Sequence, residues 1–296
     1  MSKQSTEQKD TQSQEATVGV GRASPQENRT TEVSHLAPEI KPENEVITEP
    51  IAEPEIEPLI LWVSGGKGGV GKTTAARILT DLLSDQTEYI YGYDCDPINP
   101  QFKRFYDAEY LPITSADTKT ADIAVEALAE RIEAKGHDYI IIDSPAGEID
   151  MLSQLEERFA FVSNLKDMRA RLTRVMVMST TLESVNLLEH ALSDARGLPV
   201  AHVAVRNLHF GGPHYFDAYN RSPVKAELEK QGGITIDFPE LGAIATDSID
   251  KQSLTYAEAI EKESGLPTMR RSMVFQWREK CRKAFAEAEH LLGVKA

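Results

Sequence analysis

The chain has 296 residues, enough for one large domain or two small ones. Its 32 lysine and arginine residues against 47 aspartate and glutamate residues leave a formal net charge of −15. This charge excludes a globally basic nucleic-acid-binding protein, although a local basic patch is compatible with it. With only two cysteines, Cys95 and Cys281, the chain has neither a disulfide framework nor a CxxC type of metal or redox site.

The N-terminus carries polar residues where a signal peptide would carry an apolar stretch. No uncharged apolar run approaches the roughly 18 to 20 residues that a membrane span needs. We therefore expect a soluble, cytoplasmic protein.

Residues 1–58 differ in composition from the rest of the chain. They contain no aromatic residue and no cysteine, but five basic and twelve acidic side chains, a net charge of −7. Such a segment buries too little apolar surface to offset the entropy lost on ordering, so it is expected to be a disordered tail rich in proline and glutamate. It serves either to solubilise the protein or to dock a partner.

From residue 59 onward, short apolar runs alternate with helical patterns. The expected strands are 59–63, 88–93, 139–142, 174–178, 200–205 and 234–236. The expected helices are 74–84, 121–134, 151–165, 182–195, 223–230, 253–262 and 269–292. This alternation predicts one α/β domain over 59–296, with a mainly parallel central sheet flanked by helices.

A glycine-rich segment follows the first expected strand and precedes a helix. Residues 66–73 fit the pattern G-x-x-x-x-G-K-[ST] without a mismatch, in the strand-loop-helix context that a P-loop NTPase requires. The glycines allow successive backbone N–H groups to point at phosphate oxygens, and the helix N-terminus adds partial positive charge. Lys72 is expected to reach the terminal phosphates, and the Thr73 hydroxyl to bind Mg²⁺. The loop residues expected to bind nucleotide are Gly66, Lys67, Gly68, Gly69, Val70, Gly71, Lys72, Thr73 and Thr74.

The loop contains a second lysine, Lys67, that the phosphate cradle does not need. The run Lys-Gly-Gly-Val-Gly-Lys-Thr resembles the deviant P-loop of the ParA and MinD family of ATPases. The resemblance implies that Lys67 crosses a dimer interface and contacts the phosphates held by the other subunit. It therefore implies a homodimer that forms on ATP binding, in which Lys67 and Lys72 are catalytic.

Two expected strands end in aspartates. Because ligands of open α/β sheets collect at the carboxyl ends of the strands, both clusters should face the phosphate loop. Asp143 resembles the Walker B carboxylate that holds Mg²⁺, and Asp94 lies where the family keeps the aspartate that orients or deprotonates the attacking water. We therefore expect Thr73, Asp94 and Asp143 at the metal and Asp94 as a catalytic residue. Asp96 is expected either to have a structural role or to support the residues that bind the metal.

The sequence after Asp96 departs from the commonest ParA pattern. Typical partition ATPases continue Asp-x-Asp-Pro with Gln, whereas this chain reads Ile98-Asn99-Pro100. This form resembles the TraL-type P-loop proteins encoded beside conjugative-transfer genes. The segments 206–213 and 253–259 resemble the same subgroup.

Base recognition is expected from later loops. Asn207 matches the family position whose amide pairs with adenine, although an asparagine that caps a loop is the alternative. Pro239 matches the strand-end proline near the base. His202, His209 and His214 lack the carboxylate or cysteine neighbours that metal sites usually have, so we expect no metal there.

The last expected helix carries a cluster of cations in an otherwise acidic protein. The resemblance implies DNA binding without sequence preference through Arg270, Arg271, Arg278, Lys280, Arg282 and Lys283. The alternative is a solvated amphipathic helix that packs on the sheet. A second basic set, Lys166, Arg169, Arg171 and Arg174, would extend the same surface. The segment lacks the features of a membrane anchor.

Two functions follow from these features. The first is an ATP- and Mg²⁺-dependent dimerisation switch that hydrolyses ATP and acts with a partner protein in plasmid partition or conjugative DNA transfer. The second is a docking module that binds nucleotide without hydrolysing it. A ligase of the same superfamily is a third candidate, but the sequence shows no dedicated small-molecule site.

Overall fold

The computed structural model describes residues 57–66, 68–146 and 151–296. They belong to the second of two compact units of the chain, Ala52–Ala296. The expected N-terminal tail lies outside the described residues except for positions 57 and 58.

Seven parallel strands form one sheet in the order β3-β2-β4-β1-β5-β6-β7. The first four strands along the chain are β1 (Leu59–Ser64), β2 (Ile90–Asp94), β3 (Ala108–Tyr110) and β4 (Tyr139–Asp143). They are followed by β5 (Arg171–Met178), β6 (Val200–Asn207) and β7 (Ile234–Phe238). The expected mainly parallel α/β sheet is confirmed.

Central strands of the sheet are continuous apolar runs because helices cover both of their faces. All six residues of β1 are buried, and four of the five residues of β4 are buried. β1 pairs with β4 on one side and with β5 on the other, which places the loop after β1 in the middle of the sheet edge.

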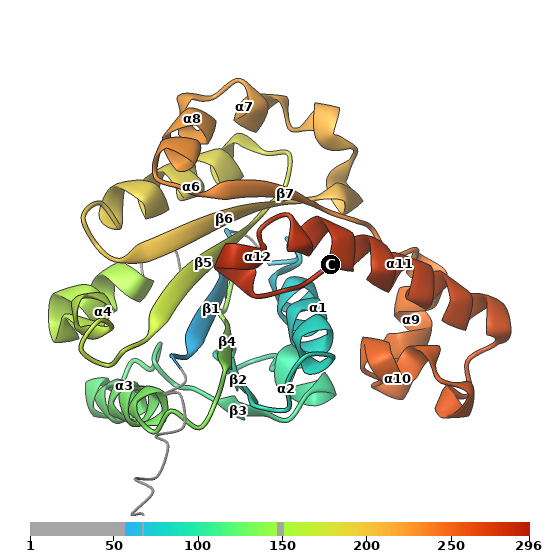
Figure 1. The fold of residues 1–296 in the computed structure, drawn as a ribbon, viewed down its shortest axis with the longest axis horizontal. Coiled ribbons are helices and arrows are strands. Elements are labelled where there is room, and N and C mark those ends of the chain that lie inside the picture. Colours follow the sequence, from blue (N-terminus) through green and yellow to red (C-terminus); the bar gives the residue numbers. More distant parts are fainter. Residues whose placement is uncertain (1–56, 67, 147–150) are drawn as a thin grey trace, which may run out of the picture. The chain divides into compact units, whose positions relative to one another are not determined.

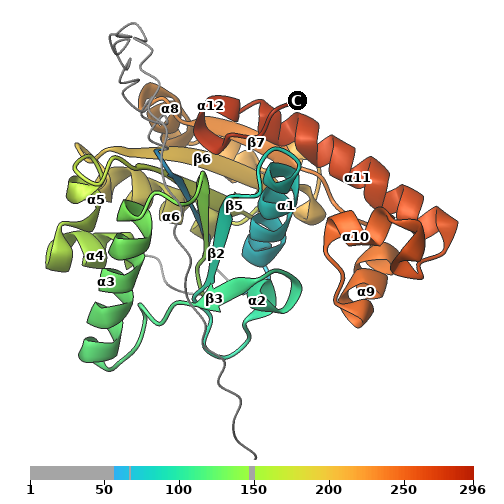
Figure 2. The same cartoon turned by 60° about the horizontal axis from the view of Figure 1, so that its bottom comes forward.

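Helices form a layer on each side of the sheet, as Figures 1 and 2 show. One layer packs its buried side chains into a single cluster with α1 (Lys72–Ser84), α2 (Gln101–Phe105), α9 (Ala243–Gln252), α10 (Tyr256–Ile260), α11 (Thr268–Ala286) and α12 (Glu289–Leu292). The opposite layer contains α3 (Thr118–Glu133), α4 (Met151–Phe159), α5 (Phe161–Asn164), α6 (Leu182–Asp194), α7 (Asp217–Asn220) and α8 (Pro223–Lys230).

The expected helix 151–165 is two helices, α4 and α5. Ala160 between them has φ 50°, a left-handed conformation that ends the first helix. The second helix then needs acceptors for its first N–H groups. The carboxylate of Glu156 supplies them, accepting from the backbone N–H groups of Val162 at 2.8 Å and Ser163 at 3.1 Å.

The sequence prediction also missed the short helices α2 and α7, the strand β3 and the helix α9, and it misplaced the ends of other elements. β3 is an edge strand of three residues of which one is buried, so it has no apolar run to detect. α9 is rich in polar residues, and the expected helix 253–262 is shorter, covering Tyr256–Ile260. The expected last helix is broken into α11 and α12 near Glu287.

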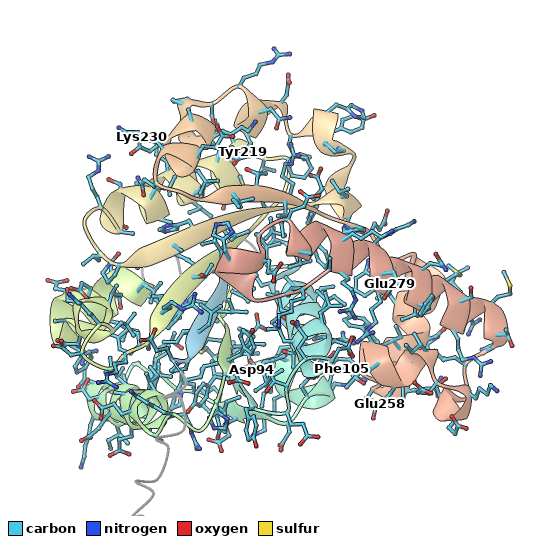
Figure 3. All side chains as sticks on the ribbon, viewed as in Figure 1. Asp94, Phe105, Tyr219, Lys230, Glu258 and Glu279 are labelled. Carbon is cyan, nitrogen blue, oxygen red and sulfur yellow. The ribbon has the colours of Figure 1, made fainter. Side chains whose placement is uncertain are left out.

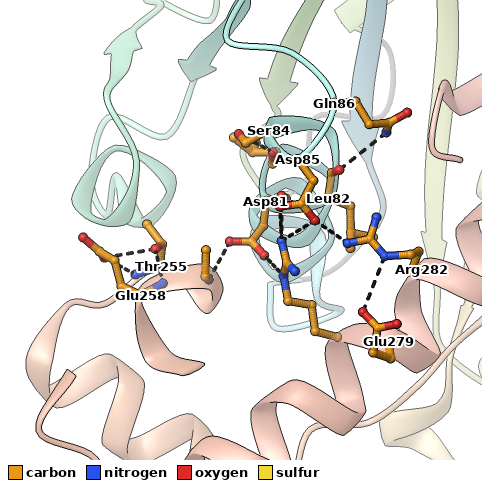
Figure 4. A network of polar contacts seen from close by, with 12 residues as sticks. Asp81, Leu82, Ser84, Asp85, Gln86, Thr255, Glu258, Glu279 and Arg282 are labelled. Atoms are coloured by element: carbon orange, nitrogen blue, oxygen red, sulfur yellow. Dashed lines mark hydrogen bonds and ion pairs between the residues drawn. The ribbon is translucent and has the colours of Figure 1, made fainter. Parts of the chain in front are cut away.

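A buried ion-pair network joins α1 to α11 (Figure 4). The guanidinium of Arg278 contacts Asp81 and binds Asp85 through Nη2 at 2.8 Å, and Arg282 adds a second contact to Asp85. The side chains of Arg278 and Asp81 are 7% and 1% exposed. The helix that begins at the phosphate loop is therefore fixed to the C-terminal part of the domain.

Candidate nucleotide site

The glycine-rich loop leaves β1 at Ser64 and enters α1 at Lys72. Gly71 caps α1 with φ 103°, a left-handed conformation that a residue with a Cβ rarely adopts. At Gly66, an added Cβ would lie 2.2 Å from Cδ1 of Leu187 in α6, so the loop backbone passes close to that helix. Both glycines thus allow the tight path that the motif predicts.

Lys67 lies outside the described residues. Its expected role across a dimer interface stays a prediction.

Lys72, Thr73 and Asp143 meet at the carboxyl ends of β1 and β4. The Thr73 hydroxyl donates to Oδ2 of Asp143 at 2.7 Å. Within the described part of the chain, the buried Oδ1 of Asp143 has no hydrogen-bond partner. An orphaned carboxylate oxygen beside a threonine hydroxyl suits a hydrated Mg²⁺, because both groups are hard oxygen ligands.

Burial controls the ionisation of this cluster. It raises the pKa of Asp143 to about 7, with the charge of Asp94 adding to the rise, while the Thr73 hydrogen bond and Lys72 oppose it. Burial also lowers the pKa of Lys72, against the opposing charges of Asp143 and Asp96. The cluster would therefore gain from a bound polyanion and divalent cation, which favour a charged lysine and a charged carboxylate.

Asp94 is fully buried and holds the β2–α2 turn together, at the lower centre of Figure 3. Its Oδ1 accepts from the backbone N–H of Asp96 at 3.0 Å, and its Oδ2 accepts from that of Lys103 at 3.0 Å. Burial raises the pKa of Asp94, and these backbone bonds oppose the rise. Both carboxylate oxygens are thus used by the turn.

Asp96 was expected either to have a structural role or to support the residues that bind the metal, and its position is compatible with the second alternative. It is half-buried, and its charge acts on both Lys72 and Asp143. Its Oδ1 accepts from the N–H groups of Ile98 and Asn99, which fixes the carboxylate at the turn. The signal was available in the sequence, since Asp96 ends the same Asp-x-Asp run, but spacing alone does not say which aspartate is buried.

Asn207 connects β6 to the phosphate loop. Its Nδ2 donates to the carbonyl of Val70 at 2.9 Å, and its Oδ1 accepts from the N–H of His209 at 3.0 Å. These are the contacts of the loop-capping alternative. The expected contact between Asn207 and adenine stays a prediction.

A cavity of about 320 Å³ adjoins the loop at Gly71 and Thr74. Its other walls include Pro239, Tyr256 and Trp277. The indole N–H of Trp277 donates to the carbonyl of Pro239 at 2.8 Å, which fixes this wall. Apolar rings and a backbone turn beside the phosphate loop form a suitable site for a nucleoside.

The expected basic surface of the last helix is smaller than the sequence suggested. Arg278 is buried in its ion pairs, and Arg282 contacts Asp85 and Glu279. Arg270 donates to Ser248 at 2.9 Å, and Arg271 donates to Thr268 at 3.4 Å. Lys280 and Lys283 are exposed. From the second expected basic set, Arg174 is 4% exposed on the sheet and so cannot belong to a surface.

The three histidines lie in different environments. His202 is buried in β6, His209 pairs with Glu240 at 3.0 Å, and His214 is exposed. In the described ranges, no group of three or more His, Cys, Asp or Glu side chains is arranged to hold a metal ion. None of the helices described there is long and apolar enough to cross a bilayer.

Comparison with known proteins gives a family and several relatives. The family model for the CobQ/CobB/MinD/ParA nucleotide binding domain matches residues 61–287. Protein MobD of Acidithiobacillus ferrooxidans is 25% identical over 236 residues, covering 78% of this chain and 98% of MobD.

Two solved structures are similar at lower identity. The ATP complex of a variant of Cyanothece McdA is 17% identical, with a TM-score of 0.44, covering 82% of this chain and 98% of McdA. The MinC:MinD cell division protein complex of Aquifex aeolicus contains a chain that is 14% identical, with a TM-score of 0.41, covering 76% of this chain and 95% of that one. Because the family model matches most of its length, the chain belongs to the CobQ/CobB/MinD/ParA family of nucleotide-binding domains.

Proposed function

We propose that this protein binds ATP with Mg²⁺ in its phosphate loop, dimerises on the nucleotide and resets by slow hydrolysis. The observation that carries the proposal is the meeting of Lys72, Thr73 and Asp143 at the carboxyl ends of β1 and β4. Burial disfavours the charged forms of Lys72 and Asp143, and a bound polyanion with a divalent cation would favour both charged forms.

Each group at this site has a role suited to its position. The N–H groups of the loop and the N-terminus of α1 bind phosphate oxygens, and Lys72 binds the terminal phosphates. Thr73 and Asp143 would hold Mg²⁺, directly or through water, and the metal would neutralise charge on the transferred phosphoryl group. Pro239 and the cavity beside Gly71 receive the nucleoside, with Asn207 as the adenine contact if its amide leaves Val70.

The water-positioning role belongs to the Asp94–Asp96 turn. The family resemblance implies this role and a place at the metal for Asp94. In the structure, both carboxylate oxygens of Asp94 accept hydrogen bonds from the backbone of the turn. Asp96 is the more accessible carboxylate and acts on Lys72. We therefore assign the contact with water to Asp96, with Asp94 as the residue that positions it.

Dimerisation supplies the remaining charge. In the proposal, Lys67 of each subunit reaches the phosphates bound by the other subunit, as the resemblance implies. A cation that arrives only on association would act as an arginine finger does. The dimer would then present Lys280 and Lys283 to DNA, with Arg270 and Arg271 at the edge of that surface.

The setting that we propose is the mobilisation or partition of a plasmid, together with a partner protein. The TraL-type segments and the likeness to MobD both support mobilisation. The second candidate is a docking module of the same complex that keeps its nucleotide unhydrolysed. The carboxylates beside Lys72 favour the first candidate.

The test is calorimetric titration with ATP in the presence of Mg²⁺ or EDTA, followed by phosphate-release assays. Asp143→Asn should weaken binding with Mg²⁺ about tenfold or more and leave binding in EDTA nearly unchanged. Exposed Asp107→Asn is the matched control. ATP binding that is equal with and without Mg²⁺ would contradict the assigned metal site. ATP binding without phosphate release would contradict hydrolysis and favour the second candidate, the docking module.

A further inference from the structure

A second and larger cavity lies in the helical layer opposite to α1. It has a volume of about 710 Å³ and is bounded by α4, α5, α6 and the strands β5 and β6. Its body is apolar, with Leu152, Val162, Leu187 and Leu198 in the walls. The size lies within the range of small-molecule sites.

Two polar side chains on adjacent strands lie at the floor of this cavity. Arg174 of β5 and His202 of β6 occupy paired positions on adjacent strands, and they are 4% and 2% exposed. Buried parallel strands normally carry apolar residues at such positions. Nε of Arg174 donates to the Ser64 hydroxyl at 3.3 Å, so the guanidinium is held against β1.

The side chain of His202, which lines this floor, has an unsatisfied nitrogen. In the part of the chain that the structure describes, Nε2 is buried and has no hydrogen-bond partner. Burial and the charge of Arg174 lower the pKa of His202 to about 4, so the ring is neutral at pH 7. A neutral ring that bonds to the backbone of Ala191 with one nitrogen offers a lone pair on the other. An unpaired buried acceptor is costly, which points to a donor from a ligand.

Four carboxylate side chains of the helices line the cavity. Glu156 and Glu157 belong to α4, and Glu183 and Asp194 belong to α6. Arg174 is the cation among the lining residues, and the His202 ring beside it is neutral. Ser153 donates to Asp194 at 3.2 Å across the space between the helices. The carboxylates favour a positive charge at the rim, while Arg174 keeps such a charge away from the floor.

We propose that this cavity binds an organic cation that has an apolar body and a hydrogen-bond donor. The donor reaches Nε2 of His202 at the floor, the body fills the apolar walls, and the positive charge lies among the carboxylates of α4 and α6. The site is separate from the phosphate loop, so the proposal does not depend on nucleotide binding.

Four indole compounds test the three parts of this recognition on the full chain, by calorimetric titration at pH 7.5. Tryptamine carries the cation, the body and the donor. Its 1-methyl derivative lacks the donor, N-acetyltryptamine lacks the charge, and indole-3-acetate reverses it. Tryptamine should bind about fivefold tighter than either of the first two controls. Indole-3-acetate binding as tightly as tryptamine would overturn the proposal, because Arg174 would then dominate the site.

Two variants locate the binding. The double variant Glu157→Gln/Asp194→Asn changes exposed rim residues and should weaken tryptamine about three- to tenfold, while Glu189→Gln on the same helix α6 is the matched control. His202→Phe should abolish the preference for tryptamine over its 1-methyl derivative. Unchanged tryptamine binding in the rim variant would contradict the proposal even if the floor variant does not fold.

The cation can be a free amine or a side chain of a partner protein. The peptide acetyl-Lys-Trp-Lys-amide, compared with acetyl-Glu-Trp-Glu-amide, separates these sources. Tighter binding of the lysine peptide than of tryptamine assigns the site to a basic partner segment, and the reverse order assigns it to a free amine. Binding of none of these compounds overturns the proposal.

Discussion

Asp94 and Asp96 lie two positions apart in the chain and make different contacts. Asp94 gives both carboxylate oxygens to backbone N–H groups of its own turn, whereas Asp96 is half-buried beside Lys72. Asp96→Asn should therefore lower the rate of ATP hydrolysis about a hundredfold or more at an unchanged melting temperature. Asp94→Asn should lower the melting temperature, since an amide offers one acceptor where the turn uses two.

Phosphate release and thermal unfolding of the two variants, measured side by side, check this difference. Wild-type turnover in the Asp96 variant would contradict the assignment of the water contact. The Asp94 variant also serves as the control for a general loss of charge at the turn.

His202 predicts a pH dependence of stability. Its pKa is about 4 in the folded chain against 6.5 for the ordinary group, so the unfolded chain binds the extra proton between these values. The contribution of His202 to the free energy of unfolding should therefore be constant above pH 6.5 and fall as the pH falls toward 4. At pH 5 the loss is about 2 kcal/mol.

Asp143, whose pKa is raised to about 7, stabilises the fold over the same interval. The loss is therefore measured by urea unfolding at pH 7.5 and pH 5 as the difference between the wild type and a His202 variant. His202→Phe should remove it, while His209→Phe, whose ring is exposed, should leave it in place. An equal loss in both variants would show that other groups cause the acid sensitivity.

The sequence predicted which residues lie together where a motif fixes their positions. Lys72, Thr73 and Asp143 lie together as the P-loop pattern implies, because the strand-loop-helix geometry brings the start of α1 to the carboxyl ends of β1 and β4. Roles that depend on burial were not predictable. Arg174 and Arg278 counted as surface cations in the sequence, yet one lies on the sheet and the other in an ion pair between helices.

The helices α1 and α11 depend on each other through charged groups. Burial raises the pKa of Asp81, and Arg278 opposes this rise by pairing with it. Arg278→Met would leave Asp81 buried without its cation and should cost about 3 to 5 kcal/mol of unfolding free energy. Lys280→Met, two residues along α11 and exposed, should change the stability by less than about 0.5 kcal/mol.

Denaturant titration of both variants measures the difference. Equal unfolding free energies of the two variants would mean that the Arg278–Asp81 ion pair stabilises the fold no more than an exposed lysine does.

Elements with a strong apolar pattern were predictable and short or polar ones were not. β1 and β4 are buried on both faces, so their sequences show continuous apolar runs. β3 is stabilised by pairing with β2 at the edge of the sheet, and α9 is stabilised by packing against α11. Neither contact can be read from the local sequence pattern. The break between α4 and α5 depends on the Glu156 carboxylate, a contact across six residues that periodicity does not detect.

The whole molecule combines a net charge of −15 with a sheet whose topology brings the loops after β1, β2 and β4 to one edge. That edge holds the nucleotide site in our proposal, and the cavity bounded by α4 and α6 lies on one face of the same sheet. In our proposal the contact with a second subunit depends on Lys67, and the expectation for Lys67 comes from the sequence resemblance.

The molar mass in solution, measured by light scattering with ATP and Mg²⁺, with ADP and without nucleotide, tests the central claim most directly. We predict a monomer of 32.8 kDa without nucleotide and a doubled mass with ATP in the Asp96→Asn variant, which should hold its nucleotide. Adding Lys67→Ala should return the mass to that of the monomer. A mass that does not change with nucleotide, or a dimer that persists with Lys67→Ala, would contradict the account.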